Sequence, residues 1–501
     1  MQVWTEGGEA SGRNRKLMPL VYYEWVRVRK QRLTAAMVFV VLLWLWARPA
    51  GAYSLLTHEQ LIDLTWNDSI VPLLLDRYPS LTPAQLEQAR AYAYGGCVIQ
   101  DIGYYPFGDE FFSDLTHYVR TGDFVVNLFR NAGNANELAF AIGALSHYIG
   151  DAEGHSLATN RAVPVEFPKL GKEYGPVVNY AEGKTQHVRT EFAFDINELA
   201  HHRMAPFNYQ KHIGLAVPVR QLALAYYQTY GITKGFSGTR EQRIDVGEYR
   251  FAVRAFIPRI ARAITILHRQ EEPADPSTPE ILELRKEVAA VAAENQWDKY
   301  QHKPGIGMYS LAGLIFILPK VGPLRMAAVK GPTVHTEEQY VHSVAVSTEA
   351  LRRMLRRFTP PPHRRASAAG DTHSQPPSHP LAGNTVSTQD APRDSRDLRH
   401  PLKNRDLDTG NVVQPGGYPL TDATYAELLH LLTRQPNLAI PPGIKEDIEA
   451  YYANLNLPIT TRKDPEKWKQ VLADLETLKA MPTREQPKPY PTYGEDEDEQ
   501  Q

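Results

Sequence analysis

Apolar residues recur every three or four positions along most of residues 53–297, which is the spacing of one face of an α-helix. The pattern is clear in THEQLIDLTWNDSIVPLLLDRY, NELAFAIGALSHYIGDAEGH and VPVRQLALAYYQTYG. Thr57 and Thr82 stand where helix N-caps are expected, and Pro83 occupies the first helical position after Thr82. Strand-like alternation is nearly absent, so we predict an all-α, multi-helix bundle.

The pattern changes after residue 297, and composition divides the rest of the chain. We expect a helical extension over residues 298–358, ending in the amphipathic sequence EALRRMLRRF. Residues 359–417 are rich in Pro, Ser, Asp, Arg and His and poor in large apolar residues, which predicts a disordered linker. A small helical unit is expected over residues 418–484, followed by an acidic disordered tail over residues 485–501.

The start of the chain has the pattern of an export signal. A basic stretch precedes the apolar run of residues 33–47, which is short for a bilayer span but suits the centre of a signal peptide. The small residues Ala50, Gly51 and Ala52 form a cleavage site, so we predict a signal peptide with a long n-region over residues 1–52 and Tyr53 as the mature N-terminus. The protein would then be exported, either secreted or periplasmic. An uncleaved segment would instead anchor it in a membrane.

Charge and cysteine content narrow the function. Cys97 is the only cysteine of the 501 residues, so no intrachain disulfide can form and an exported chain must rely on packing or metal. Residues 1–52 carry eight basic and three acidic side chains, so their removal changes the formal net charge from −2 to −7. A chain with this balance has no general attraction to phosphate backbones, and no nucleic-acid partner is expected.

The best candidate for chemistry is the stretch HYIGDAEGH, in which His147, Asp151 and His155 lie four residues apart. A single His–Asp pair at this spacing is weak evidence, because such pairs are usually surface contacts on one helix face. A second pair with the same spacing, His187 and Glu191, occurs in HVRTE. Imidazole nitrogens and carboxylate oxygens are ligands that zinc accepts, so the recurring pairs indicate a metal site. Further candidates in the same helical block are His58, Asp101 and His117.

With these residues, the segment 53–297 resembles the zinc-dependent phospholipase C family, whose α-helical trinuclear-zinc fold is shared with single-strand-specific nucleases. The resemblance implies three zinc ions per chain. It implies that Tyr53 binds one ion through its α-amino nitrogen and carbonyl oxygen, with His58 and a bridging Asp151. A second ion would be held by Asp101, His117, His147 and Asp151, and a third by His155, His187 and Glu191.

One spacing departs from the usual family pattern. Typical members place the next histidine six residues after the bridging aspartate, whereas His155 follows Asp151 by four. The form DAEGHSL is similar to a segment of glycosylphosphatidylinositol-specific phospholipase D. We interpret the short spacing as a sign of a substrate other than the usual one of the family.

The resemblance implies an exported zinc-dependent phosphodiesterase that acts on phospholipids or related phosphodiesters at a membrane surface. Clustered zinc ions would activate a water for in-line attack on phosphorus, and Asp101 would orient or deprotonate this water. One alternative is a nuclease on the same fold, although such nucleases usually have Asp where this chain has Glu191. Another is a catalytically silent, zinc-stabilised surface or interaction protein. The sequence does not identify a protein partner.

Residues near Asp101 allow two interpretations. An aromatic cluster could line a lipid-binding cleft or form ordinary core around a loop; its members are Tyr104, Tyr105, Phe107, Phe111 and Phe112. Asp109 and Asp114 are the alternative carboxylates to Asp101, and we interpret both as turn or cap residues.

Overall fold

The computed structural model describes residues 55–104, 108–232, 257–268, 278–317, 330–358 and 402–484. Within these ranges the regular elements are helices, and the only strand-like pairings are the isolated bridges Arg405–Val412 and Ile440–Thr483. The predicted all-α class is therefore confirmed. The predicted signal peptide, Tyr53 and the acidic tail lie outside the described residues.

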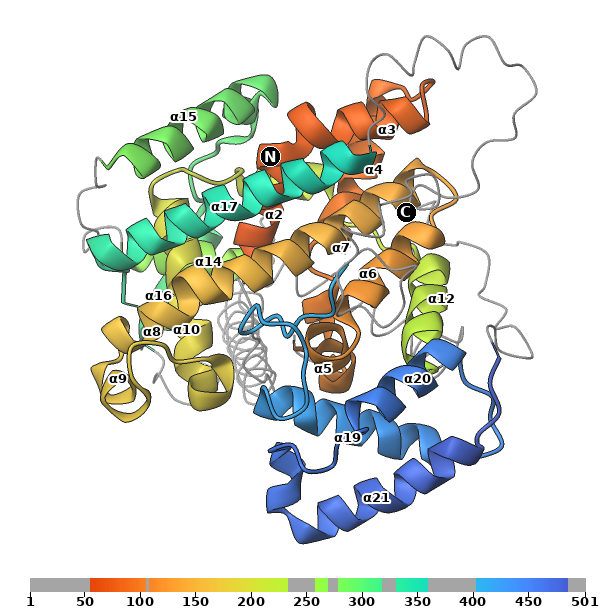
Figure 1. The fold of residues 1–501 in the computed structure, drawn as a ribbon. Coiled ribbons are helices and arrows are strands. Elements are labelled where there is room, and N and C mark those ends of the chain that lie inside the picture. Colours follow the sequence, from red (N-terminus) through yellow and green to blue (C-terminus); the bar gives the residue numbers. More distant parts are fainter. Residues whose placement is uncertain are drawn as a thin grey trace, which may run out of the picture.

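Helix α7 (Ala135–Gly154) runs through the centre of the molecule (Figure 1). It packs against α4 (Pro83–Gly96), α6 (Thr121–Arg130), α2 (Leu55–Thr65) and α17 (Val334–Phe358). Almost every residue of α7 is buried, as expected for a helix that is covered on all sides.

The close contact between α4 and α7 depends on glycine. A Cβ atom on Gly143 of α7 would lie 2.2 Å from the main-chain oxygen of Ala93 in α4, and one on Gly96 would lie 2.0 Å from that of Phe140. These distances are too short for any side chain, so the two helices approach each other backbone to backbone.

The other helices surround this centre. Before the chain reaches α17 they are η1 (Trp66–Ile70), α3 (Val71–Arg77), η2 (Gln100–Tyr104), α5 (Glu110–Tyr118), η3 (His155–Thr159), α8 (Asn160–Glu166), α9 (Pro168–Tyr174), α10 (Tyr180–Ala200), α11 (Phe207–Ile213), α12 (Val219–Tyr230), α14 (Ile257–His268), α15 (Pro279–Glu294), η5 (Trp297–Tyr300) and α16 (Ile306–Ile317).

The two predicted N-caps have different outcomes. Thr82 caps α4 as predicted, accepting a hydrogen bond from the amide of Gln85 in a full capping box with Pro83 at the first turn. The prediction for Thr57 is wrong, because α2 already begins at Leu55. The Thr57 hydroxyl instead donates to Asp195 Oδ1 of α10 at 2.7 Å, so it ties two helices together.

The helical extension of residues 298–358 is packed into the same body as the first helices. Helix α17 contacts α7, η3, α2 and α15, and Figure 1 shows it crossing one face of the bundle. Its Glu337 accepts a hydrogen bond from the buried Arg203 at 2.7 Å, and Arg203 also donates to Glu198 at 2.6 Å.

The last helices form the predicted small unit, and it lies against the bundle. They are α19 (Pro419–Thr433), α20 (Pro442–Tyr451), η7 (Thr460–Lys463) and α21 (Pro465–Ala480). Helix α19 contacts α5, and α20 contacts α12. Tyr425 and Tyr451 stack at 3.7 Å between ring centroids inside this unit.

The predicted disordered linker requires a correction at its C-terminal end. Residues 359–401 lie outside the described residues, but residues 402–417 form an ordered segment, which we call the strap. In Figure 1 the strap runs between α7 and α5 before it enters α19. Its polar composition suggested disorder, yet those polar groups build turns: Asp406 Oδ1 accepts hydrogen bonds from the amides of Asp408 and Thr409.

Glycine at position 410 lets the strap approach α7 closely. Gly410 has φ +72°, and a Cβ atom there would lie 2.4 Å from the main-chain oxygen of Ala152. Only glycine meets both conditions without strain. The strap is therefore fitted to the end of α7 that carries the predicted metal ligands.

Candidate metal centre

All predicted ligands inside the described residues converge in the interior of the bundle. Each of these residues is at most 1% exposed. They come from six elements that the sequence alone could not place together: His58 from α2, Asp101 from η2, His117 from α5, His147 and Asp151 from α7, His155 from η3, and His187 and Glu191 from α10.

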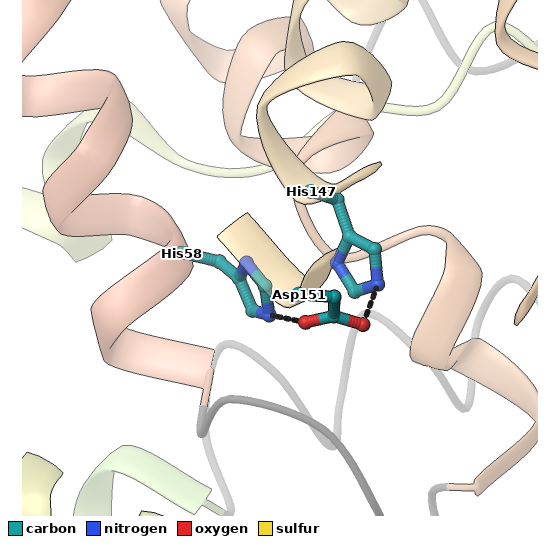
Figure 2. Close-up of side chains that lie close together, drawn as sticks. All are labelled: His58, His147 and Asp151. Atoms are coloured by element: carbon teal, nitrogen blue, oxygen red, sulfur yellow. Dashed lines mark ion pairs between the residues drawn. The ribbon is translucent and has the colours of Figure 1, made fainter. Parts of the chain in front are cut away.

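Asp151 lies at the middle of the first group. Its Oδ1 is 3.2 Å from Nε2 of His58, while its Oδ2 is 3.1 Å from Nε2 of His147. Figure 2 shows the carboxylate between these two imidazoles, with one oxygen directed to each. Oδ2 is also 3.2 Å from Nε2 of His117. The two oxygens of Asp151 thus face different sets of imidazoles, as a carboxylate that bridges two metal ions would.

Asp101 completes the side of this group formed by α5. Its Oδ1 is 3.3 Å from Nε2 of His117 and 4.0 Å from Nε2 of His147. The Nε2 atoms of the two histidines are themselves 3.4 Å apart. Asp101, His117 and His147 therefore offer three ligand atoms around one small volume.

A separate group forms between η3 and α10. Oε1 of Glu191 is 3.0 Å from Nε2 of His155 and 2.9 Å from Nε2 of His187. The short Asp151–His155 spacing puts His155 at the start of the π-helical turn η3, with its ring against His187. The pair His187 and Glu191 thus meets His155, the last residue of HYIGDAEGH, in space.

The imidazoles are oriented by main-chain oxygens. Nδ1 of His117 donates to the main-chain oxygen of Ser113 at 2.7 Å. In the same way, Nδ1 of His147 donates to that of Cys97 and Nδ1 of His155 to that of Leu407, both at 3.0 Å. A carbonyl oxygen can only accept, so each Nδ1 carries its proton. In a neutral ring this leaves the Nε2 lone pair pointing into the cluster, which is the tautomer that a metal ligand needs.

The carboxylates have acceptor atoms that the described residues do not satisfy. Both Oδ atoms of Asp151, Oδ1 of Asp101 and Oε2 of Glu191 are buried and accept no hydrogen bond within the described part of the chain. Burying ionised oxygens is costly unless a cation or donors compensate them. Because lone pairs of nitrogen and oxygen face each other here, the donor set fits bound zinc.

The electrostatics of the protein without metal point the same way. Burial would lower the pKa of His117, but the close, negatively charged carboxylates of Asp101 and Asp151 raise it well above the usual value. Burial opposes ionisation of Asp151 as well, yet the neighbouring histidines hold its pKa well below the usual range. The carboxylates thus draw positive charge to the site, either as protons or as metal.

Several residues around the group of His155, His187 and Glu191 were not predicted from the sequence. Asp408 of the strap has Oδ1 3.7 Å from Nδ1 of His155, and its Oδ2 accepts hydrogen bonds from Tyr118 (2.9 Å) and Tyr418 (2.6 Å). Asn160 Nδ2 donates to the main-chain oxygen of Asp408 at 2.7 Å. No sequence signal marks a carbonyl oxygen as a partner of a histidine, and the composition of the strap had assigned Asp408 to a linker.

The aromatic cluster separates into two roles where it is described. Phe112 belongs to the hydrophobic core, with Phe111 packed against it. Tyr104 instead lies beside the candidate ligands, with its ring 5.3 Å from that of His117 and 6.5 Å from that of Tyr180. Tyr105 and Phe107 lie outside the described residues.

The two alternative carboxylates to Asp101 belong to none of the three ligand groups. Asp109 caps α5 by accepting a hydrogen bond from the Phe111 amide, as predicted for a cap residue. Asp114 accepts a hydrogen bond from the Tyr104 hydroxyl at 2.9 Å.

Comparison with known proteins identifies the region that contains this site. Residues 57–235 match the family model described as zinc dependent phospholipase C. This part of the chain belongs to the zinc-dependent phospholipase C family. All the described candidate ligands fall inside the matched region, whereas the strap, α16 and α17 lie beyond it. No curated protein and no solved structure matches the chain.

Membership in the zinc-dependent phospholipase C family supports hydrolase activity of phospholipase C type, a phospholipid substrate and zinc as the metal. The three buried groups of histidines and carboxylates fit zinc binding. None of the helices in the described ranges is long and apolar enough to cross a membrane.

Proposed function

We propose that this protein is an exported phosphodiesterase of phospholipase C type that holds three zinc ions. The observation that carries the proposal is the position of Asp151, whose two oxygens face His58 on one side and His117 with His147 on the other. A carboxylate in this position can join two metal ions and fix the distance between them.

The three groups of ligand atoms support the proposed ligand assignment. His58 and Asp151 would hold one ion together with the mature N-terminal residue Tyr53. A second ion is held by Asp101, His117, His147 and Asp151. The third is held by His155, His187 and Glu191, whose ligand atoms form a group of their own.

The chemistry of a phosphodiester explains the need for this cluster. Zinc ions supply Lewis-acid activation of water and compensate the negative charge of the phosphate in the transition state. Asp101 Oδ1 has an unused acceptor site beside His117 and His147. It is placed to orient a water molecule and to accept its proton during attack on phosphorus.

Other residues keep this geometry fixed. The carbonyl oxygens of Ser113, Cys97 and Leu407 hold three imidazoles in the ligand tautomer. Tyr104 and Tyr180 contact the rings of His117 and His187 and shield that side of the cluster. Exclusion of bulk water in this way strengthens each electrostatic interaction at the site.

A substrate panel tests the proposal. Purified protein is assayed with dispersed phosphatidylcholine and with single-stranded DNA, and zinc is measured by elemental analysis. We expect headgroup release from the lipid, close to three zinc ions per chain and no nucleotide release. His147→Ala should abolish hydrolysis of the lipid. The matched control is His212→Ala at an exposed position of α11, which should retain this activity.

The other outcomes discriminate among the alternatives. Nucleotide release without lipid cleavage would favour the nuclease, even though Glu191 stands where such nucleases usually have Asp. Bound zinc without turnover of either substrate would favour a silent, zinc-stabilised protein. N-terminal sequencing of exported protein tests the role of Tyr53, because a mature start at any other residue removes the proposed α-amino ligand.

A further inference from the structure

Helix α16 exposes an unusually apolar surface. Its sequence IGMYSLAGLIFI contains no charged residue. Four of its side chains have the largest exposed fractions of all large apolar residues in the described ranges: Ile306 at 87%, Ile317 at 79%, Phe316 at 74% and Tyr309 at 54%. An exposed apolar patch of this kind marks a surface that contacts another apolar phase.

These side chains form one face of the helix. Residues 306, 309, 313, 316 and 317 follow the three- and four-residue spacing of a single helix face. Gly313 lies in this row, and a Cβ atom there would meet no described atom within 4 Å. The opposite face, with Ala312 and Ile315, is buried in the core beside α14.

The dimensions of α16 restrict what the face can contact. Twelve helical residues are about 18 Å long, well short of the roughly 30 Å of a bilayer core. An apolar helix of this length is usually a buried core helix or lies in a membrane interface. The exposure of Ile306, Phe316 and Ile317 excludes burial of this face by the described residues.

The charge around α16 distinguishes a lipid surface from a second copy of the chain. Within the described residues, Lys299 and Lys303 precede α16 and Lys330 follows it, and the sequence from 299 to 330 contains no acidic residue. Two copies that met through α16 would bring these like charges together. Anionic lipid headgroups attract them, while the apolar side chains enter the acyl boundary.

We propose that α16 is an interfacial docking helix that binds the protein to anionic phospholipid surfaces. The inference deepens the proposed function, since a membrane surface is where a phospholipid substrate is found. Helix α14, against which α16 packs, also contacts α10, the helix that carries His187 and Glu191. Helix α14 therefore connects α16 to the helix that carries two of the proposed ligands. Docking through α16 would hold this part of the bundle close to the lipid surface.

Site-specific fluorescence tests the proposal on the full chain. Phe316→Cys is labelled with a polarity-sensitive dye and compared with Leu282→Cys on α15, whose wild-type side chain is 48% exposed. The native Cys97 is fully buried and remains unlabelled in folded protein. We expect a blue shift at position 316 with vesicles of phosphatidylcholine and phosphatidylglycerol, a weaker one with phosphatidylcholine alone, and none at position 282.

A partition measurement provides the second test. The double variant Phe316→Asp, Ile317→Asp should bind the mixed vesicles at least about tenfold more weakly, because two large apolar side chains no longer enter the lipid. Leu282→Asp should bind as the wild type does. Hydrolysis of a dispersed short-chain phospholipid should be unchanged in both variants, so that a failure of docking and a failure of the proposed activity can be told apart.

Several results would overturn the inference. The dye at position 316 could remain in water while the protein sediments with vesicles, which would place the contact elsewhere, for example at residues 33–47. A blue shift that grows with protein concentration in the absence of lipid would show that a second copy covers α16. Failure of the wild type to bind either vesicle would refute docking outright.

Discussion

Nδ1 of His155 donates a hydrogen bond of 3.0 Å to the main-chain oxygen of Leu407, although 252 residues separate them along the chain. Leu407 in turn donates its amide to the main-chain oxygen of His117 at 3.0 Å. The strap thus contacts two candidate metal ligands from different helices. A segment outside the family match is consequently part of the structure that positions the ligands.

Replacement of Asp408 should weaken the third metal site. The carboxylate lies beside Nδ1 of His155 and accepts hydrogen bonds from Tyr118 and Tyr418. Loss of a residue that contacts a metal ligand, but not the metal itself, typically lowers metal affinity about 10- to 100-fold. We expect Asp408→Asn to weaken binding of one zinc ion by this factor in a competition titration with a chelator.

Asp464→Asn is a suitable control for Asp408→Asn. Asp464 caps α21, far along the chain from His155, and asparagine is an equally good cap. Equal zinc affinity in the Asp408→Asn variant and the wild type would show that the strap does not act on the metal centre.

Replacement of Asp151 should have a larger effect than replacement of Asp408. Both of its oxygens face imidazole nitrogens, so Asp151→Asn removes the charge that joins two of the proposed ions. We expect the turnover number to fall by more than about 100-fold, because replacing even a residue that only contacts a metal ligand can lower activity by this factor. Elemental analysis should also show fewer zinc ions per chain. Glu153→Gln, two residues further along α7, should retain activity and zinc; a fully active Asp151→Asn variant would contradict the bridging role.

The stability of the metal-free protein should depend on the protonation of His155. Burial would lower its pKa, but the charges of Asp151, Glu191 and Asp408 and the hydrogen bond to Glu191 raise it from 6.5 to about 10. The folded state therefore binds this proton more tightly than the unfolded state. The resulting stabilisation is fully present below pH 6.5 and is lost as the pH rises toward 10.

Thermal unfolding and calorimetry can check this pH dependence. The Tm of chelator-treated protein should fall between pH 6.5 and pH 10, and the zinc-loaded protein should change less because the metal keeps His155 neutral. Zinc binding below pH 10 should release a proton, seen as a dependence of the binding heat on the buffer. A Tm of the metal-free protein that rises over this range would contradict the interpretation.

Loss of Arg203 should destabilise the bundle as a whole. Its side chain is 2% exposed and bonds to Glu198 of α10 and to Glu337 of α17. Arg203→Met would leave two buried carboxylates without their cation, which costs about 3–5 kcal/mol in free energy of unfolding. Urea denaturation should show this loss, whereas the exposed Arg161, which donates to the main-chain oxygen of Ser156, should tolerate the change to Met.

Part of the candidate site could be predicted from local sequence patterns. Residues four apart share a helix face, so the pairs His147–Asp151 and His187–Glu191 each place two ligands together before any tertiary contact forms. Helical periodicity likewise predicts α7 and α10 and the all-α class. The capping of α4 by Thr82 was predictable for the same reason, since a cap involves only neighbours in the chain.

Only the tertiary structure decided how distant segments meet. Polar composition suggested that residues 402–417 were disordered, because it reports the lack of apolar side chains and not the turns and long-range hydrogen bonds that Asp406 and Asp408 make. The carbonyl oxygens that fix His117, His147 and His155 carry no sequence signal, since every residue has one. An apolar run such as α16 also has the same local pattern whether it is buried or exposed. The sequence by itself therefore determined the helices and the ligand types, and packing determined which segment holds the metal centre and which helix remains uncovered.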